Sequence, residues 1–332
     1  NLTTAKSIWN ICYEKGSHGK TRKKVILILG LFCSISAFAD CAGNGLWVFP
    51  KNKTINQNSI FVLTGYAESQ HVIFALNKKH PVYLKSGHHK IKLLVSEICI
   101  GQFYLTQAIL KPETPLEAGL EYTLCIDKLP EYEHLDRYNS KTESYEPISY
   151  TVSTVVDTNK PELLTSAKEL KKTIHYYGCG PAKYVVFSNP ATDSSEIIIK
   201  TTVKNLKTRK ETTYYVEPNL EVINVGHDMC SGAFTYDAAD EQYEIEFSYM
   251  DSSGNLTPWT GERIQFTKPT AENSDTNDWT FHINQEIPFW RMKSAFSLSI
   301  WNSRKFFTYY GLSFGLTRIQ DNPYPHPQPH YQ

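Results

Sequence analysis

The sequence predicts an all-β protein, and three observations carry this prediction. Aromatic residues make up 13% of the 332 residues, with 21 Tyr and 16 Phe but only 3 Met. Short apolar runs rich in Ile, Val and Thr recur along the chain, and Gly, Pro or Asn stand between them. No run is long and periodic enough to predict a helix. Because β-branched and aromatic side chains favour strands, we expect many short strands joined by turns.

The first element along the chain is a secretory signal peptide at residues 21–39. The basic residues Lys20, Arg22, Lys23 and Lys24 come first, an apolar stretch covers Val25–Phe32, and the small-x-small pattern Ala37-Phe38-Ala39 follows. This order is typical of a signal that is cleaved after its last small residue. The apolar stretch is shorter than the roughly 20 residues of a membrane-spanning helix, although a retained anchor is the alternative. We expect an exported protein, periplasmic, cell-surface or extracellular, with no membrane-spanning segment in the mature chain.

No methionine precedes this signal, since the first one along the chain is Met229. Residues 1–20 are therefore predicted to be an upstream extension that is not native. The mature chain is predicted to begin at Asp40.

From residue 40 to residue 156, short apolar runs follow one another at the spacing of a β-sandwich. Turn residues separate these runs, and we expect the polar residues 130–147 to form a long surface loop before the last strand. The predicted strands are Leu46–Phe49, Ile60–Leu63, Val72–Leu76, Val82–Leu84, Ile91–Val95, Phe103–Leu110, Tyr122–Ile126 and Ile148–Val152.

The stretch from Leu116 to Ile126 carries the most diagnostic pattern. Tyr122 stands six positions after Leu116, Gly119 lies at the turn between them, and alternating apolar residues follow the tyrosine. This pattern resembles the corner between strands E and F of fibronectin type III and related bacterial Ig-like domains. The resemblance implies that the Tyr122 hydroxyl bonds back to the corner backbone. Ala118 departs from the family, which usually has Pro there.

A second domain is predicted for residues 157–269. It opens at Asp157–Pro161, which is similar to the linkers between bacterial Ig-like domains. Residues 162–175 have some helical spacing, but the resemblance implies an extended first strand. The other predicted strands are Tyr184–Phe187, Ile197–Val203, Thr212–Val216, Val222–Val225, Ala233–Tyr236, Tyr243–Tyr249 and Ile264–Phe266.

The turn at Asp251–Asn255 resembles the one that closes many bacterial Ig-like domains. Gly254 is predicted to supply the positive φ that this turn requires. The fold expected is therefore two tandem Ig-like or fibronectin type III-like β-sandwiches, 40–156 and 157–269, after a signal peptide. Residues 270–332 are first rich in aromatic residues and then rich in Pro, and they predict an irregular tail, uncertain or disordered.

Five of the seven cysteines remain after removal of the signal peptide. In an exported protein, each domain can hold one disulfide. Cys179 and Cys230 are predicted to pair, closing a loop of about 50 residues and contributing roughly 4 kcal/mol in the chain-entropy model. Cys41 can pair with Cys99 or with Cys125, and one of the three is left over. The chain has no C-x-x-C pair, so we predict no zinc site.

The balance of positive and negative residues limits the kinds of partner that we expect. Lys plus Arg equals Asp plus Glu, at 34 each, so we predict no nucleic-acid partner. The basic hairpin tip Lys204–Lys210 is interpreted as a solvated turn rather than an anion site. His88 and His89 lie in a turn and are expected to face solvent, so neither a metal nor a cofactor is predicted.

One loop, Gly226–Gly232, combines His, Asp, Cys and Ser and is a candidate for catalysis. A Cys–His nucleophile pair needs a free thiol, whereas Cys230 of an exported protein has Cys179 available for a disulfide. We therefore predict a non-catalytic binding, adhesion or structural protein, with a protein or a glycan at the cell envelope as its partner. Its layout resembles uncharacterised secreted bacterial proteins with tandem Ig-like or fibronectin type III-like domains. The alternative is a secreted hydrolase, or an accessory module of a larger extracellular enzyme, with its site near Gly226–Gly232.

Overall fold

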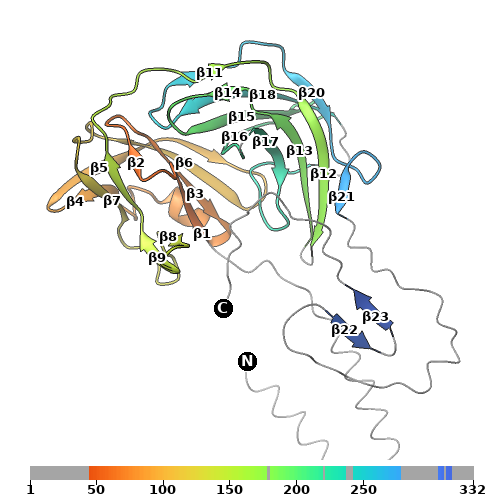
Figure 1. Cartoon of the computed structure of the whole chain (residues 1–332), viewed down its shortest axis with the longest axis horizontal. Helices are drawn as coiled ribbons and strands as arrows, with labels where there is room; N and C mark the ends of the chain where they lie inside the picture. The colour runs from red at the N-terminus through yellow and green to blue at the C-terminus, as the bar shows by residue number, and fades with distance from the viewer. Residues whose placement is uncertain are drawn as a thin grey trace, which may run out of the picture. The chain divides into compact units, whose positions relative to one another are not determined.

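The computed structural model describes residues 45–177, 180–219, 221–236 and 242–277, together with the backbone of 306–309 and 312–315. The predicted signal peptide, the upstream extension, Cys41 and Cys179 lie outside these residues. The all-β prediction is confirmed, because the regular elements of the described residues are all strands except a 3-10 turn, η2 (Ala67–Ser69), and one short helix, α3 (Gln70–Phe74). Figure 1 shows the strands in chain order, the earlier ones in orange to yellow and the later ones in green to blue.

The earlier strands form a sandwich in which one long strand serves both sheets. The sheet order is β1-β3-β6-β5-β4-β7-β10-β2, and β5 pairs with β4 through its first residues and with β6 from Leu93 to Ile100. The strands are β1 (Gly45–Phe49), β2 (Thr54–Ile55), β3 (Phe61–Tyr66), β4 (Val82–Ser86), β5 (His89–Ile100), β6 (Leu105–Pro112), β7 (Glu121–Ile126) and β10 (Ser149–Val152). The order β1-β3-β6-β5 matches strands A-B-E-D of an Ig-like sandwich, and β4-β7-β10 matches C-F-G.

Tyr122 lies in this first sandwich at the start of β7. Its side chain is 1% exposed, and its hydroxyl oxygen accepts a hydrogen bond from the backbone N–H of Glu117 at 3.4 Å. The turn between these two residues passes through Gly119, whose φ is +80°. A tyrosine that bonds back over the turn before its strand fixes the angle at which the strand enters the sheet.

We expect Tyr122→Phe to lower the free energy of unfolding by about 1 kcal/mol, because it removes one hydrogen bond and leaves the ring in place. Urea unfolding followed by circular dichroism measures the change. Tyr145→Phe is the control, since Tyr145 is 64% exposed, and its loss of stability should stay within about 0.5 kcal/mol. Equal losses in the two variants would contradict a structural role of the corner hydroxyl.

The later strands form a second sandwich of two sheets. One sheet has the order β17-β13-β12-β21, and the other has the order β16-β15-β18-β19 with β20 also paired to β18. These strands are β12 (Glu169–Tyr177), β13 (Gly180–Ser188), β15 (Ile197–Asn205), β16 (Glu211–Val216), β17 (Val222–His227), β18 (Gln242–Asp251), β19 (Leu256–Thr257), β20 (Ile264–Thr267) and β21 (Asp275–Asn277). Between the sheets, the Phe187 ring packs edge-on against Phe247 and Phe266, with ring centroids 5.3 and 5.6 Å away.

The short segments differ most from the sequence predictions. Val72–Leu76, predicted as a strand, lies mostly in α3, which packs so closely on β3 that a Cβ on Gly65 would lie 2.6 Å from Ile73 Cγ1. The predicted loop 130–147 contains a hairpin of β8 (Asp136–Asn139) and β9 (Ser144–Pro147).

Three other segments also bear on the sequence predictions. Residues 162–175 are extended, in β11 (Glu162–Leu163), which pairs with β14 (Ala191–Thr192), and in β12. The prediction of a strand at Ala233–Tyr236 is wrong, because the backbone groups of Ala233 and Thr235 bond to Gln102 in a turn of the first sandwich instead of to a neighbouring strand. Within the predicted tail, β22 (Phe306–Tyr309) and β23 (Leu312–Gly315) form an antiparallel pair.

Candidate functional site

The two sandwiches meet along a joint that is apolar at its centre. Most strands there bury one face in their own sandwich and the other face in the joint, whereas the end of β5 buries Cys99 in the joint and leaves Ile98 and Ile100 exposed. In β3, for example, Phe61 and Leu63 belong to the core of the first sandwich, while Val62 belongs to the joint. The buried residues of the joint are Phe49, Ile60, Val62, Cys99, Ile109, Ile198, Tyr215 and Met250. All the described residues on both sides belong to one compact unit, residues 42–332.

A buried pair of hydrogen bonds crosses this joint. The Gln107 side chain on β6 donates from Nε2 to the carbonyl oxygen of Tyr215 at 2.9 Å and accepts from the Tyr215 N–H at 2.8 Å. Tyr215 lies on β16 of the second sandwich and is 6% exposed, and Gln107 is 5% exposed. The glutamine amide thus satisfies both backbone groups of one residue in a place where water has little access.

Beside this pair, the Glu97 carboxylate on β5 accepts hydrogen bonds from two side chains of the second sandwich. Lys200 Nζ lies 2.8 and 3.1 Å from its two carboxylate oxygens, and the Tyr215 hydroxyl donates to Oε2 at 2.9 Å. Burial would raise the pKa of Glu97, but the hydrogen bonds from Lys200 and Tyr215 outweigh it and lower the pKa. Burial raises the pKa of the neighbouring Cys99 thiol to about 12, and the charge of Glu97 acts in the same direction. The cluster is therefore an ion pair at neutral pH, with a thiol that stays protonated.

The lowered pKa of Glu97 predicts a dependence of stability on pH. Its contribution is fully present above the unfolded-state value, roughly 4.3, and is lost as pH falls through the lower folded-state pKa. We expect Glu97→Gln to remove part of the decline in unfolding free energy between about pH 5 and pH 3. Urea unfolding of both proteins across this range measures the difference, and parallel pH profiles would contradict it.

The linker between the sandwiches is held by a second polar network. Asp157 exchanges hydrogen bonds with Asn58: its N–H donates to Oδ1 at 3.0 Å, and its carbonyl oxygen accepts from Nδ2 at 2.6 Å. The same carbonyl accepts from Asn255 Nδ2 at 3.0 Å, and Asp157 Oδ2 accepts from the Ser195 hydroxyl at 2.7 Å. Gly254, with a φ of +84°, turns the chain inside this network.

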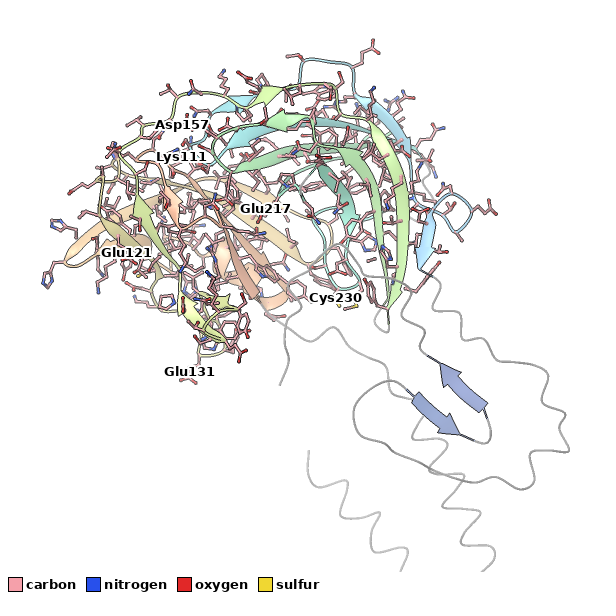
Figure 2. The ribbon with its side chains drawn as sticks, in the orientation of Figure 1. Lys111, Glu121, Glu131, Asp157, Glu217 and Cys230 are labelled. Carbon is pink, nitrogen blue, oxygen red and sulfur yellow. The ribbon has the colours of Figure 1, made fainter. Side chains whose placement is uncertain are left out.

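Three carboxylates of this network, Asp157, Asp193 and Asp251, each place an oxygen within 4.8 Å of the others. Burial, with a smaller effect from the charge of Asp157, raises the pKa of Asp251. Carboxylate oxygens are the ligands that Ca²⁺ prefers. Each of the three, however, already accepts hydrogen bonds from nearby N–H or O–H groups, and these bonds account for the cluster. In Figure 2, Asp157 lies far from Cys230, near the opposite end of the second sandwich.

The predicted catalytic loop, Gly226–Gly232, lies where β17 ends. His227 Nδ1 is 2.8 Å from the carbonyl oxygen of Asp228, and its ring meets that of Phe103 edge-on at 5.6 Å. Burial lowers the pKa of His227, so its imidazole is neutral at pH 7. Cys230 is disulfide-bonded and carries no thiol. The loop thus holds a histidine without the cysteine nucleophile that the catalytic reading requires.

The cysteines of the first sandwich differ from the prediction. Cys99 and Cys125 are both free thiols, so the bridge from one of them to Cys41 is not formed among the described residues. Cys99 is buried in the joint, where its thiol donates to Glu97 Oε1 at 3.7 Å. Cys125 lies on β7 opposite Tyr83, and burial raises its pKa. The two thiols lie on different strands, β5 and β7.

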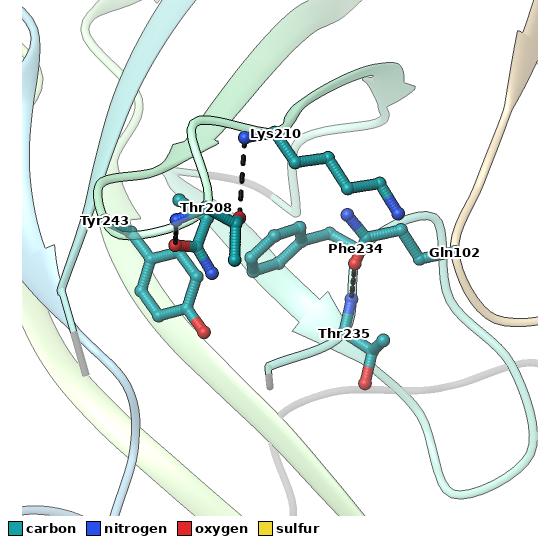
Figure 3. A pocket seen from close by; sticks show the side chains of 7 residues that line it. Gln102, Thr208, Lys210, Phe234, Thr235 and Tyr243 are labelled. Atoms are coloured by element: carbon teal, nitrogen blue, oxygen red, sulfur yellow. Dashed lines mark hydrogen bonds between the residues drawn. The ribbon is translucent and has the colours of Figure 1, made fainter. Parts of the chain in front are cut away.

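A cavity of about 290 Å³ opens where a turn of the first sandwich meets the second. Figure 3 shows its lining, which combines two aromatic rings with amides, hydroxyls and one ammonium group. The lining residues are Gln102, Asn205, Thr208, Lys210, Phe234, Thr235 and Tyr243. Gln102 comes from the turn between β5 and β6, and the other six come from the second sandwich.

Backbone pairing fixes this turn against the second sandwich. The Gln102 N–H donates to the carbonyl oxygen of Ala233 at 2.9 Å, and Phe103 and Gly232 exchange two bonds of 3.1 and 2.7 Å. Gln102 Oε1 also accepts from the Thr235 N–H at 3.2 Å. Sequence reasoning did not find this site. At the cavity itself the sequence offers the basic hairpin Lys204–Lys210, whose pattern indicates a solvated turn rather than a site.

Comparison with known proteins identifies no family. No protein-family model and no curated protein matches the sequence. Among solved structures, the tandem Ig repeats of Dlar match 70% of this chain and 100% of that chain, at 8% identity and a TM-score of 0.20. The type I pullulanase of Bacillus subtilis matches 69% of this chain at 11% identity and a TM-score of 0.19, and only 25% of the pullulanase is covered. Domains 1–6 of the surface layer protein SbsC match 74% of this chain and 36% of that chain, at 11% identity and a TM-score of 0.22. Similarity at this level assigns no function to the chain.

Within the described residues, no helix has the length and the apolar character needed to cross a membrane.

Proposed function

We propose that the chain is an exported, non-catalytic binding protein whose two Ig-like sandwiches are held in one fixed arrangement and share a ligand site. The observation that carries this proposal is the joint, in which an apolar centre surrounds the buried Gln107–Tyr215 pair. Domains joined only by a linker are expected to move relative to each other. A joint with buried, satisfied polar groups opposes such motion.

A fixed joint matters for binding because it preorganises any site that spans it. A ligand that enters a preformed cavity does not have to order two mobile bodies, and the free energy lost to ordering is smaller. The cavity beside Gln102 is preformed in this sense. Its lining comes from both sandwiches, and backbone hydrogen bonds hold the turn between β5 and β6, which carries Gln102, against the second sandwich. The proposed partner remains a protein or a glycan at the cell envelope.

Export is the second part of the proposal, and it rests on the signal pattern of residues 21–39. An oxidising compartment permits the Cys179–Cys230 disulfide. The positions of their neighbours support this pairing, because a Cβ on Gly180 would lie 3.5 Å from the Met229 carbonyl oxygen. Non-reducing peptide maps of the exported protein are expected to contain the linked Cys179 and Cys230 peptides. Alkylation of Cys230 without prior reduction would contradict the pairing.

The binding function is tested with the chain purified from the compartment to which it is exported. Arrays of glycans, peptidoglycan fragments and envelope proteins are expected to retain it above the level of an unrelated two-domain Ig-like protein. No retention on any array would overturn the proposal. The alternative, a hydrolase with its site near Gly226–Gly232, requires substrate turnover that is lost in a His227→Ala variant. It has less support, because the bonded Cys230 supplies no nucleophile.

A further inference from the structure

We propose that the free edge of β5 binds an extended segment of a partner protein, which adds to the sheet as a further strand. The segment is expected to carry apolar residues at alternate positions and acidic residues at one end. This inference goes beyond the proposed function, because the edge residues 93–100 are not among the described residues that line the cavity beside Gln102.

The second half of β5 has a partner on one side only. Among the described strands, Leu93–Ile100 pair with β6, whereas only the first residues of β5 pair with β4 (Figure 1). In an antiparallel pair, residues that bond across the pair alternate with residues whose backbone groups point the other way. The Gly101 N–H donates to the carbonyl oxygen of Leu105 at 2.8 Å, which continues the register of the pair. Counted back from this bond, Ile98 and Ile100 point their N–H and C=O groups to the free side.

The outward backbone groups of the edge are open to a partner from Ile98 onward. At the other end, the Leu93 carbonyl oxygen already accepts a hydrogen bond from Asn77 Nδ2 at 2.7 Å. Within the described residues, no group bonds to the outward groups of Ile98 or Ile100. An extended peptide that pairs with an exposed sheet edge gains its affinity from main-chain bonds of this kind.

The side chains of this edge are apolar and exposed. Ile98 is 41% exposed and Ile100 is 62% exposed, and they lie opposite Ala108 and Thr106 of β6. The bulge of β5 comes earlier, before Glu97, and leaves both isoleucines in regular register. Exposed edge strands usually carry charges or covering segments that prevent pairing with another chain. Here an added strand with an apolar residue opposite each isoleucine would cover both of them.

The edge of β16 shows the protection that the edge of β5 lacks. The outward N–H and C=O groups of Tyr215 bond to the Gln107 side chain at 2.8 and 2.9 Å. That edge is buried in the joint, so it cannot take up a further strand. The edge of β5 is therefore the one that we assign to a partner.

The Leu93 end of the edge is basic. Asn77 holds the turn after α3 against this end, and the next two residues, Lys78 and Lys79, are exposed. Neither lysine forms an ion pair within the described part of the chain. A partner segment with acidic residues at this end complements the charge and is favoured over a basic one.

Two carboxylates belong to the strands and loops beside this turn, and each has a cation near it. Asp127 accepts from the Tyr83 hydroxyl at 2.8 Å, and Lys90 Nζ lies 4.2 Å from the centre of the Tyr83 ring. The Glu113 N–H donates to the carbonyl oxygen of Lys92 at 2.9 Å, which places these two residues side by side. The positive charge of the turn after α3 is therefore in excess.

The experiment uses the full exported chain, isotope-labelled for NMR, and peptides with blocked ends. The probe is Glu-Glu-Thr-Val-Thr-Val-Thr-Glu-Glu, and two control peptides replace either both Val by Ser or all Glu by Lys. The probe is expected to bind at least tenfold more tightly than either control. At saturation it is expected to slow hydrogen exchange of the Ile98 and Ile100 amides at least tenfold. Equal binding of the three peptides, or no binding of any, overturns the proposal.

Matched variants locate the site. Ile98→Lys places a charge on the edge and is expected to weaken the probe at least tenfold. Leu170→Lys is the control, because Leu170 is 57% exposed on β12, which has β13 on one side and β21 on the other. Both positions are exposed, so both variants are expected to fold, and circular dichroism checks this. Equal weakening in the two variants would contradict a site at β5.

The basic turn is tested by the double variant Lys78→Gln, Lys79→Gln. It is expected to reduce the preference for the acidic probe over its Lys-containing control at least threefold, and rising salt is expected to act in the same direction. Lys160→Gln is the control, since Lys160 is exposed on the linker between the sandwiches. An unchanged preference in the double variant overturns the acidic end of the partner segment.

The remaining outcomes concern other occupants of the edge. If the Ile98 and Ile100 amides are already protected in the chain without peptide, another segment of the chain covers the edge, and the proposal is wrong. Dimers that Ile98→Lys dissociates in sedimentation, together with no binding of the probe, would identify a second copy as the occupant and overturn it. Probe binding without retention on any array contradicts the proposed function alone, and retention without probe binding contradicts this inference alone.

Discussion

Gly226→Ala is expected to lower the free energy of unfolding by about 3 kcal/mol, the sum of backbone strain and a steric clash. Gly226 lies in β17 opposite Tyr184 of β13, and its φ is +148°, a conformation that side chains disfavour. A Cβ at this position would also collide with the carbonyl oxygen of Lys183. Backbone atoms of a paired strand cannot move aside without breaking the ladder, so the second sandwich has no easy way to accommodate the methyl group.

A second glycine separates the two causes. Gly119 has a φ of +80°, yet a Cβ there would meet no atom within 4 Å. Gly119→Ala is therefore expected to lower the free energy of unfolding by only about 1 kcal/mol, from backbone strain alone. Urea unfolding of the wild type and both variants gives the comparison. Equal losses would show that the close approach at Gly226 has no separate effect.

The sequence predicted the strands well where a strand buries one face and exposes the other. Tyr243–Tyr249 is such a case: its alternate residues Tyr243, Ile245, Phe247 and Tyr249 lie in the core of the second sandwich. Val72–Leu76 was not predicted correctly, because a short run of buried apolar residues has no periodicity that distinguishes a strand from a helix. There the deciding contact is tertiary, since Ile73 packs against Gly65 of β3.

The candidate site was not predictable for a related reason. Glu97, Gln107 and Tyr215 lie on the faces of their strands that a single sandwich would leave in water. Contact between the two sandwiches buries Gln107 and Tyr215 and partly covers Glu97. The sequence did hold one signal, because β3 and the residue before it are apolar at consecutive positions, Ile60–Leu63. A strand that is apolar on both faces indicates that both faces are covered, but the pattern does not name the second partner.

Gln107→Ala is expected to have the largest effect at the joint, lowering the free energy of unfolding by about 3 kcal/mol. The substitution leaves the N–H and the carbonyl oxygen of Tyr215 without the partners that the amide supplies at 2.8 and 2.9 Å. Both groups would then stay buried without hydrogen-bond partners, or the joint would open and admit water. Opening of the joint separates the sandwiches without unfolding them.

Hydrogen exchange distinguishes these two outcomes and tests the fixed arrangement on which the proposed function depends. If the joint opens, the Tyr215 amide exchanges at least tenfold faster while amides in the two cores, such as that of Phe247, keep their protection. Gln57→Ala is the control, because Gln57 donates to the Thr154 carbonyl oxygen at an exposed position, and its loss is expected to stay within about 0.5 kcal/mol. Unchanged exchange at Tyr215 in Gln107→Ala would mean that the apolar residues around it hold the joint without the amide. The shared cavity would then owe its fixed shape to Val62, Ile109 and Met250 rather than to the buried hydrogen bonds.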